Sequence, residues 1–124
     1  MPERDVEALK ERMKRFGLAI IRLAEKLPGG RIAGVISTQM VKSGTSAGAN
    51  YRAACRARSR ADFVSKMGIV EEELDETLYW LEVSLGAGFL SRLDVDDLLR
   101  EGNELLAIVV SSIRTAKRPR SRMQ

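Results

Sequence analysis

The stretch "SGTSAGANYRAACRARSRADF", residues 43–63, decides the fold, because its glycines and hydroxyls suit two very different structures. It could form a loop that cradles phosphate, or it could belong to a packed helix. A phosphate-binding loop needs the pattern G-x-x-x-x-G-K-[ST] between a strand and a helix. Here Gly44 and Gly48 are four positions apart, Asn50 follows where a lysine is needed, and no strand pattern precedes them. The sequence therefore favours a helix.

Helical phase sorts residues 31–58 into an apolar side and a basic side. In a helix each residue is rotated by about 100° from the one before it. This rotation puts seven residues on the apolar side: Ala33, Ile36, Met40, Gly44, Ala47, Tyr51 and Ala54. Four cations fall on the opposite side within an arc of roughly 80°: Arg31, Lys42, Arg52 and Arg56. A loop has no reason to be sorted in this way. We therefore predict a helix over these residues.

Three more amphipathic segments flank this helix. Apolar residues recur every three or four positions over residues 6–27, 63–85 and 95–116, which is typical of helices packed in a bundle. Pro28-Gly29-Gly30 ends the first segment. Residues 1–117 are thus predicted to form an all-α, up-down-up-down four-helix bundle. Residues 118–124, rich in arginine and without apolar periodicity, are predicted to be a basic disordered tail.

Polar residues before the later segments predict how those helices begin. Ser59 is the expected N-cap of the third helix, with Asp62 as an acidic partner in a capping box. Asp94 or Asp96 is the expected N-cap of the fourth helix. Gly86 and Gly88 mark the end of the third helix.

Length and composition set the class of protein. The chain has 124 residues, of which 44% are apolar and 31% charged, enough for a single domain with its own core. Cys55 is the only cysteine, so no internal disulfide can form, as expected in a reducing cytoplasm. No apolar run approaches the ~20 residues that cross a bilayer. We expect a soluble, cytoplasmic protein without a membrane partner.

The sequence offers little for catalysis or metal binding. Glu73 and Glu76 have the spacing of a carboxylate pair, but the chain contains no histidine and a single cysteine. Di-iron bundles combine such glutamates with histidines, and nucleophilic triads need a base that is missing here. We expect a solvated or salt-bridged acidic helix face, no cofactor, no metal, no small-molecule substrate and no enzyme activity.

Charge is distributed unevenly along the chain, which has a net charge of +4. Residues 31–60 carry six cations and no acid, whereas residues 61–93 carry seven acids and two cations. Two interpretations remain open. The two segments could attract each other, within one chain or between subunits, or the cations could bind RNA or DNA. The candidate nucleic-acid contacts are Arg31, Lys42, Arg52 and Arg56.

Two flanks beyond the apolar faces are candidates for a subunit interface. Gly34, Val41 and Gly48 recur every seven residues along the second helix. Each glycine costs about 1 kcal/mol relative to alanine in a helix, so close contact with another backbone is expected, either within the bundle or between subunits. Ile69 and Trp80 form a similar flank on the third helix, where a tryptophan serves either as packing at the edge of the core or as an interface anchor.

Residues 43–82 also carry a family resemblance. The patterns S-G-T-S-x-G-A-N-Y-R, R-A-x-S-x-x-[DE]-F and E-x-x-E-T-x-Y-W-L-E follow one another, and "SSIRTAK" at 111–117 extends a looser match. The chain resembles the bacterial four-helix-bundle proteins first noticed in intervening sequences of 23S ribosomal RNA genes. The resemblance implies a ring-like homopentamer without an established enzyme activity. A more distant relative, the accessory protein of diversity-generating retroelements, is a basic pentamer that binds reverse transcriptase and nucleic acid.

The match has departures. Ala53 replaces a glutamate that the family commonly has, and Glu71-Glu72 replace an apolar–basic pair. The matching polar residues are predicted to form a structural network between the second and third helices: Asn50, Arg52, Glu73 and Glu76. Two functions are left: a non-enzymatic homo-oligomeric bundle associated with nucleic acid, or a protein-interaction scaffold with no nucleic-acid binding.

Overall fold

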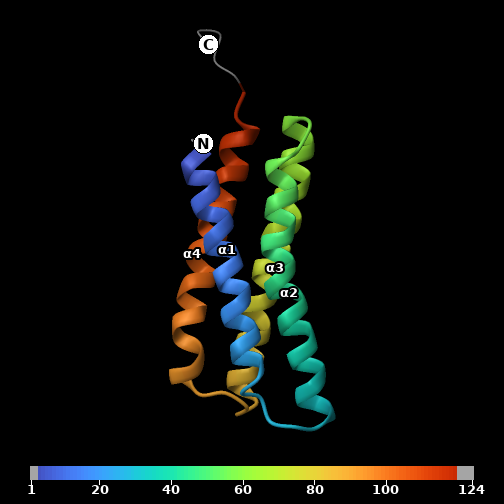
Figure 1. The fold of residues 1–124 in the computed structure, drawn as a ribbon, viewed down its shortest axis with the longest axis vertical. Helices are drawn as coiled ribbons and strands as arrows, with labels where there is room; N and C mark the ends of the chain where they lie inside the picture. The colour runs from blue at the N-terminus through green and yellow to red at the C-terminus, as the bar shows by residue number, and fades with distance from the viewer. Residues whose placement is uncertain (1–2, 120–124) are drawn as a thin grey trace.

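Four antiparallel helices make up the computed structural model, which describes residues 3–119 (Figure 1). They are α1 (Glu3–Ala24), α2 (Arg31–Cys55), α3 (Arg60–Gly86) and α4 (Arg92–Lys117). Within the described residues there is no strand, so the predicted all-α bundle with up-down-up-down topology is confirmed. The start of α1, the α2–α3 turn and the end of α4 lie at the same end of the bundle. Most of the predicted tail, from residue 120 on, lies outside the described residues.

The sorted segment forms α2 as predicted, although the helix ends at Cys55 rather than at residue 58. All seven residues of its predicted apolar side are buried. The helix stops because the Arg56 amide bonds to the Ala53 carbonyl at 3.1 Å, which tightens the last turn into 3₁₀ geometry. The stretch that decided between loop and helix therefore lies mainly in a packed helix.

The caps of α3 and α4 differ in how well the sequence predicted them. Ser59 caps α3, and its hydroxyl accepts a hydrogen bond from the Asp62 amide at 3.0 Å. The expected cap of α4 at Asp94 or Asp96 is wrong, because Ser91 caps this helix. Asp94 instead stands in the first turn and accepts a hydrogen bond from the Ser91 amide at 2.9 Å. This reciprocal capping box satisfies two amides at once, which neither aspartate could do as the cap.

Glycines bring α1 and α2 into close contact. A Cβ added at Gly44 would lie 2.9 Å from Ile20 Cγ2, and one added at Gly17 would lie 3.2 Å from the Gly44 carbonyl oxygen. Gly48 faces Met13, whose Cβ would lie 3.5 Å from an added Cβ. The close backbone approach expected from the glycine content is thus present at Gly44 and Gly48, within one bundle.

A buried pair of hydroxyls joins α2 to α3. Ser43 Oγ and Thr77 Oγ1 lie 2.9 Å apart, and both residues are fully buried. Each hydroxyl also reaches a carbonyl of its own helix: Met40 for Ser43 at 3.2 Å and Glu73 for Thr77 at 2.8 Å. These bonds fix the register of the two helices without leaving a buried polar atom unsatisfied.

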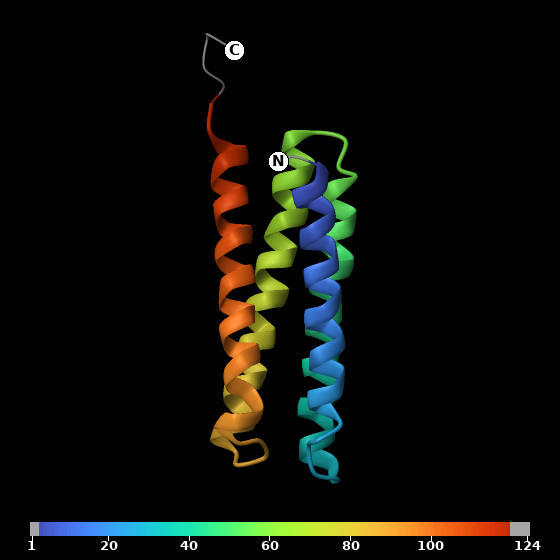
Figure 2. The same ribbon diagram turned by 60° about the vertical axis from the view of Figure 1, so that its left-hand side comes forward.

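The seam between α1 and α4 combines apolar packing with charge, and a Cβ added at Gly102 would lie 3.2 Å from Phe16 Cζ. α1 contacts α4 far less than it contacts α2, and Figure 2 shows the ribbons of α1 and α4 apart along their whole length. Arg12 bridges this seam, with Nε 2.8 Å from Glu101 and Nη2 2.7 Å from Glu104. The two carboxylates raise the pKa of Arg12 above its ordinary value.

Candidate nucleic-acid interface

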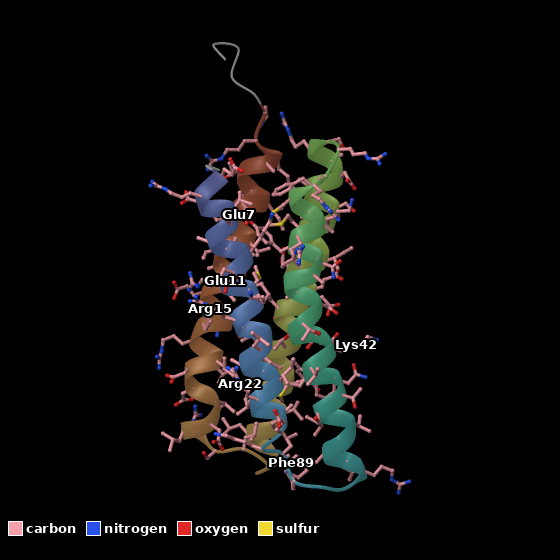
Figure 3. All side chains as sticks on the ribbon, in the orientation of Figure 1. Glu7, Glu11, Arg15, Arg22, Lys42 and Phe89 are labelled. Atoms are coloured by element: carbon pink, nitrogen blue, oxygen red, sulfur yellow. The ribbon has the colours of Figure 1, made fainter. Side chains whose placement is uncertain are left out.

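The four predicted nucleic-acid contacts are all exposed, but they do not form one patch. None of the four makes an ion pair within residues 3–119. α2 has 25 residues, so roughly 37 Å separate Arg31 at its start from Arg56 just after its end. Lys42 lies about midway on the outer side of α2 (Figure 3). Only Arg52 and Arg56 are close enough to act together.

Other cations gather near those two arginines at one end of the bundle. Arg58 and Arg60 belong to the α2–α3 junction, and Arg60 Nη1 donates a hydrogen bond to the Arg118 carbonyl at 3.2 Å. This bond places the end of α4 beside the start of α3. We define the basic end by seven exposed cations: Arg52, Arg56, Arg58, Arg60, Arg114, Lys117 and Arg118. In the part of the chain that the structure describes, none of them makes an ion pair with a carboxylate.

Two of the acids near the basic end are paired with lysines. Asp62 is bound by Lys66 at 2.7 Å, and this ion pair lowers the pKa of Asp62. Glu7, labelled near the start of α1 in Figure 3, accepts from Lys10 at 2.9 Å. Glu3 and Asp5, in the first turn of α1 at the same end, make no ion pair within the described residues and offset part of this charge. The seven cations outnumber these acids, so a net positive field is left for an external anion.

Lys42 stands apart from this end, beside the acidic face of α3. Burial is the main cause that raises the pKa of Glu73, and the neighbouring Glu76 adds to it, while Lys42 acts in the opposite direction. Lys42 thus offsets charge within the protein, so it is a weaker candidate for binding phosphate than the arginines of the basic end.

The predicted polar network between α2 and α3 is not assembled. Asn50 Nδ2 donates to the Ser46 carbonyl of its own helix at 2.9 Å, and Glu76 accepts from Trp80 Nε1 at 3.4 Å. Among the described residues, no hydrogen bond or ion pair joins Asn50 or Arg52 to either glutamate. The reason is geometric, since residues two apart on a helix face nearly opposite ways. The polar link is instead Ser43 with Thr77, which the sequence analysis missed although both residues flank apolar helix faces.

The candidate interface residues lie on two different surfaces. Gly48 and the half-buried Val41 lie on the side of α2 that faces α1, whereas Gly34 has no neighbour within 4 Å of an added Cβ. Between α1 and α2 runs a groove of about 450 Å³, lined by Met13, Gly17, Leu18 and Gly48 among others. We call it the α1–α2 groove.

The second surface is on α3. Trp80 is half-buried against the core, and its ring meets that of Tyr79 edge to face with centroids 5.1 Å apart. Tyr79 is 57% exposed and Ile69 41% exposed. We call Ile69, Tyr79 and Trp80 the α3 ridge. The two surfaces are not brought together within one chain.

The described residues offer neither a metal-binding cluster nor a membrane-spanning helix. Across residues 3–119, no three acidic or cysteine side chains gather as metal ligands would. No helix in the same range is both long and apolar enough to span a bilayer.

Comparison with known proteins places the chain in a family. The model of the family described as 23S rRNA-intervening sequence protein matches residues 4–111. A solved structure from Bacteroides thetaiotaomicron, described as a protein of unknown function from the S23 ribosomal protein family, has 34% sequence identity and a TM-score of 0.80. The similarity covers 86% of this chain and 98% of that one. Among curated proteins, none matches the chain.

Proposed function

The chain belongs to the 23S rRNA-intervening sequence protein family, and we propose that it is a non-enzymatic helical bundle that binds nucleic acid through its basic end. The observation that carries this proposal is the gathering of seven exposed cations, from two segments far apart in sequence, without carboxylate partners among the described residues. Such a cluster can neutralise several phosphates and release their counterions. The chain has no histidine and a single cysteine, which supports a binding role over catalysis and suits a reducing cytoplasm.

Binding of this kind would read charge and shape more than sequence. The cations come from the end of α2, the α2–α3 junction and the end of α4. Within the described residues they do not form a row along one helix that could read base edges in a groove. We therefore expect RNA and DNA of many sequences to bind, with an affinity that falls steeply as salt rises.

The experiment compares two pairs of charge reversals. Fluorescence anisotropy with labelled RNA and DNA is measured over a salt series for the wild type, for Arg56→Glu with Arg58→Glu, and for Arg22→Glu with Arg31→Glu. The second pair makes the same change in net charge with exposed residues away from the basic end: Arg22 is labelled in Figure 3, and Arg31 begins α2 at the end opposite the α2–α3 turn. Reversal at the basic end should weaken binding about tenfold or more and reduce the slope of log K against log salt by about 2.

Two results would count against the proposal. Equal weakening by the two pairs would assign binding to net charge alone. A wild type that binds no nucleic acid at the lowest salt would remove this function altogether.

We also propose that the chain assembles with copies of itself, burying the α3 ridge of one copy near the α1–α2 groove of the next. The support is that both surfaces remain open in a single chain and lie on different faces, as contacts in a closed ring require. The family resemblance favours five subunits.

Truncation of Trp80 tests the assembly. Loss of an interface tryptophan often costs at least ~2 kcal/mol per contact, so Trp80→Ala should shift the light-scattering mass toward monomer at micromolar concentration. Leu93→Ala is the control, because Leu93 is 93% exposed and belongs to neither surface. A monomeric wild type ends the assembly proposal, and a Trp80→Ala variant that stays fully assembled removes Trp80 from it.

The alternative function, a protein-interaction scaffold with no nucleic-acid binding, is supported by one observation. The α3 ridge joins the exposed ring of Tyr79 to the half-buried ring of Trp80, and aromatic residues are enriched in protein interfaces. The salt series above separates the alternatives, because a scaffold should bind no nucleic acid at any salt concentration.

A further inference from the structure

A cavity of about 270 Å³ lies at the basic end of the bundle. Every one of its lining residues is neutral, and all four helices and the α2–α3 turn contribute: Val6, Tyr51, Ala54, Cys55, Ala57, Ser59, Phe63 and Ser112. Ligand pockets for drug-sized molecules measure about 300–1,000 Å³. This cavity therefore suits a single small ring system and not a larger molecule.

Tyr51 gives the cavity a hydroxyl whose hydrogen-bonding neighbour is the Cys55 thiol, a weak donor and acceptor. The residue is 2% exposed, and among the described residues no buried side-chain nitrogen or oxygen atom lacks a hydrogen-bond partner. Burial, followed by the adjacent Cys55 thiol, raises the pKa of Tyr51, so the phenol stays neutral and can both donate and accept. Buried tyrosine hydroxyls usually find a partner. Since a thiol is only a weak partner, the phenol can also bond to the polar edge of a ligand.

Phe63 adds an aromatic ring to the wall of the same cavity, and Ser59 and Ser112 add hydroxyls. A planar heteroaromatic ring matches this lining, since its face can pack on Phe63 while its edge bonds to hydroxyls. The absence of any charged lining residue favours a neutral ring.

Cations border the cavity along the α2–α3 turn. Cys55, Ala57 and Ser59 line it, and the residues that alternate with them are Arg56, Arg58 and Arg60. Arg60 reaches from this turn to the Arg118 carbonyl on α4, the helix that supplies Ser112. If Arg60 held the phosphate of a nucleotide, the base of that nucleotide would thus lie near the cavity that Ser59 lines.

We propose that this cavity binds one unpaired nucleobase of a single-stranded nucleic acid whose phosphates are held by the basic end. The inference rests on the proposed nucleic-acid function and adds to it a preference for single strands, because bases stacked in a duplex cannot enter a cavity.

Cys55 provides the readout, because it is the only cysteine of the chain and lines the cavity. The rate of its alkylation by iodoacetamide is measured on the full chain, alone and with a saturating single-stranded oligouridylate. The matched probe is an abasic oligonucleotide of the same length, with the same number of phosphates and no bases. Binding of both probes is followed separately by anisotropy.

The base-containing strand should slow alkylation by roughly tenfold when nine tenths of the protein is occupied, and the abasic strand should leave the rate within twofold of the free protein. Tyr51→Phe keeps the ring and removes the hydroxyl, so it should retain binding to the abasic strand and lose most of the protection by oligouridylate. The comparison of the two strands on the wild type needs no variant, so it stands even if Tyr51→Phe destabilises the fold.

Each other outcome overturns the inference. If both strands bind and neither slows alkylation, the cavity is not a base site while the proposed function survives. Equal protection by both strands would assign protection to the phosphate backbone. If neither strand binds, the proposed function fails together with this inference.

Discussion

The middle of the bundle and its basic end are built in opposite ways. In the middle, the Gly44 position leaves no room beside Ile20, and the buried hydroxyls of Ser43 and Thr77 are fully satisfied. At the basic end, a cavity adjoins the core, the Tyr51 hydroxyl lies beside the Cys55 thiol, and the seven cations make no ion pair with a carboxylate within the described residues. The difference indicates that stability is concentrated in the middle, and the basic end is the region for which we propose binding.

The largest expected effect comes from filling the α1–α2 contact. Gly44→Leu must place a side chain where even a Cβ would lie 2.9 Å from Ile20, so the helices must separate. We expect a loss of about 3 kcal/mol or more in the free energy of unfolding, or failure to fold. Denaturant unfolding followed by circular dichroism measures it.

Gly34→Ala is the matched control in the same helix. No atom lies within 4 Å of an added Cβ there, so the higher helix propensity of alanine should stabilise α2 by up to about 1 kcal/mol. Loss of stability in both variants would show that α2 as a whole, and not its contact with α1, is sensitive.

A smaller effect is expected at the hydroxyl pair of the middle. Ser43→Ala and Thr77→Val should each cost about 1 kcal/mol, because each leaves a buried hydroxyl with one partner fewer. The double variant should lose less than the sum, with a coupling of about 0.5–1 kcal/mol. Strict additivity in a double-mutant cycle would mean that the 2.9 Å contact does not join α2 and α3 energetically.

The smallest effect concerns Glu73, on the acidic face of α3. The pKa of Glu73 is raised by burial and by Glu76, so the ionised carboxylate is less favourable in the folded chain than in the unfolded one. Stability from this group is therefore complete below the unfolded pKa, near 4.3, and is lost as pH rises through the folded pKa. Glu73→Gln should stabilise the protein by about 0.2–0.5 kcal/mol at pH 7 and not at pH 3. A gain of the same size at both pH values would contradict the electrostatic cause.

Helical phase made much of the fold predictable from sequence. The seven apolar residues of α2 and the cap at Ser59 follow from local rules, because periodicity and capping depend on neighbours along the chain. The cap of α4 shows the limit of those rules, since Ser91 and Asp94 are both good caps and only their reciprocal bonds decide between them.

The candidate site was predicted only in part. All four predicted cations are exposed, but Arg31 and Lys42 lie away from the cluster, because a helix of 25 residues spreads one face over its whole length. Arg60 and Arg118 come together through the pairing of α3 with α4, which no local pattern encodes. The cavity around Tyr51 was missed for the same reason, since it needs residues from all four helices.

Amide hydrogen exchange, measured on the free chain and with a saturating single-stranded oligonucleotide, tests most directly whether the basic end is the binding region. We predict that residues 40–51 and 70–81 exchange slowest in both states, and that nucleic acid newly protects residues 52–60 and 112–118. New protection centred on residues 31–42, or exchange in the middle of the bundle as fast as at the basic end, would contradict this account.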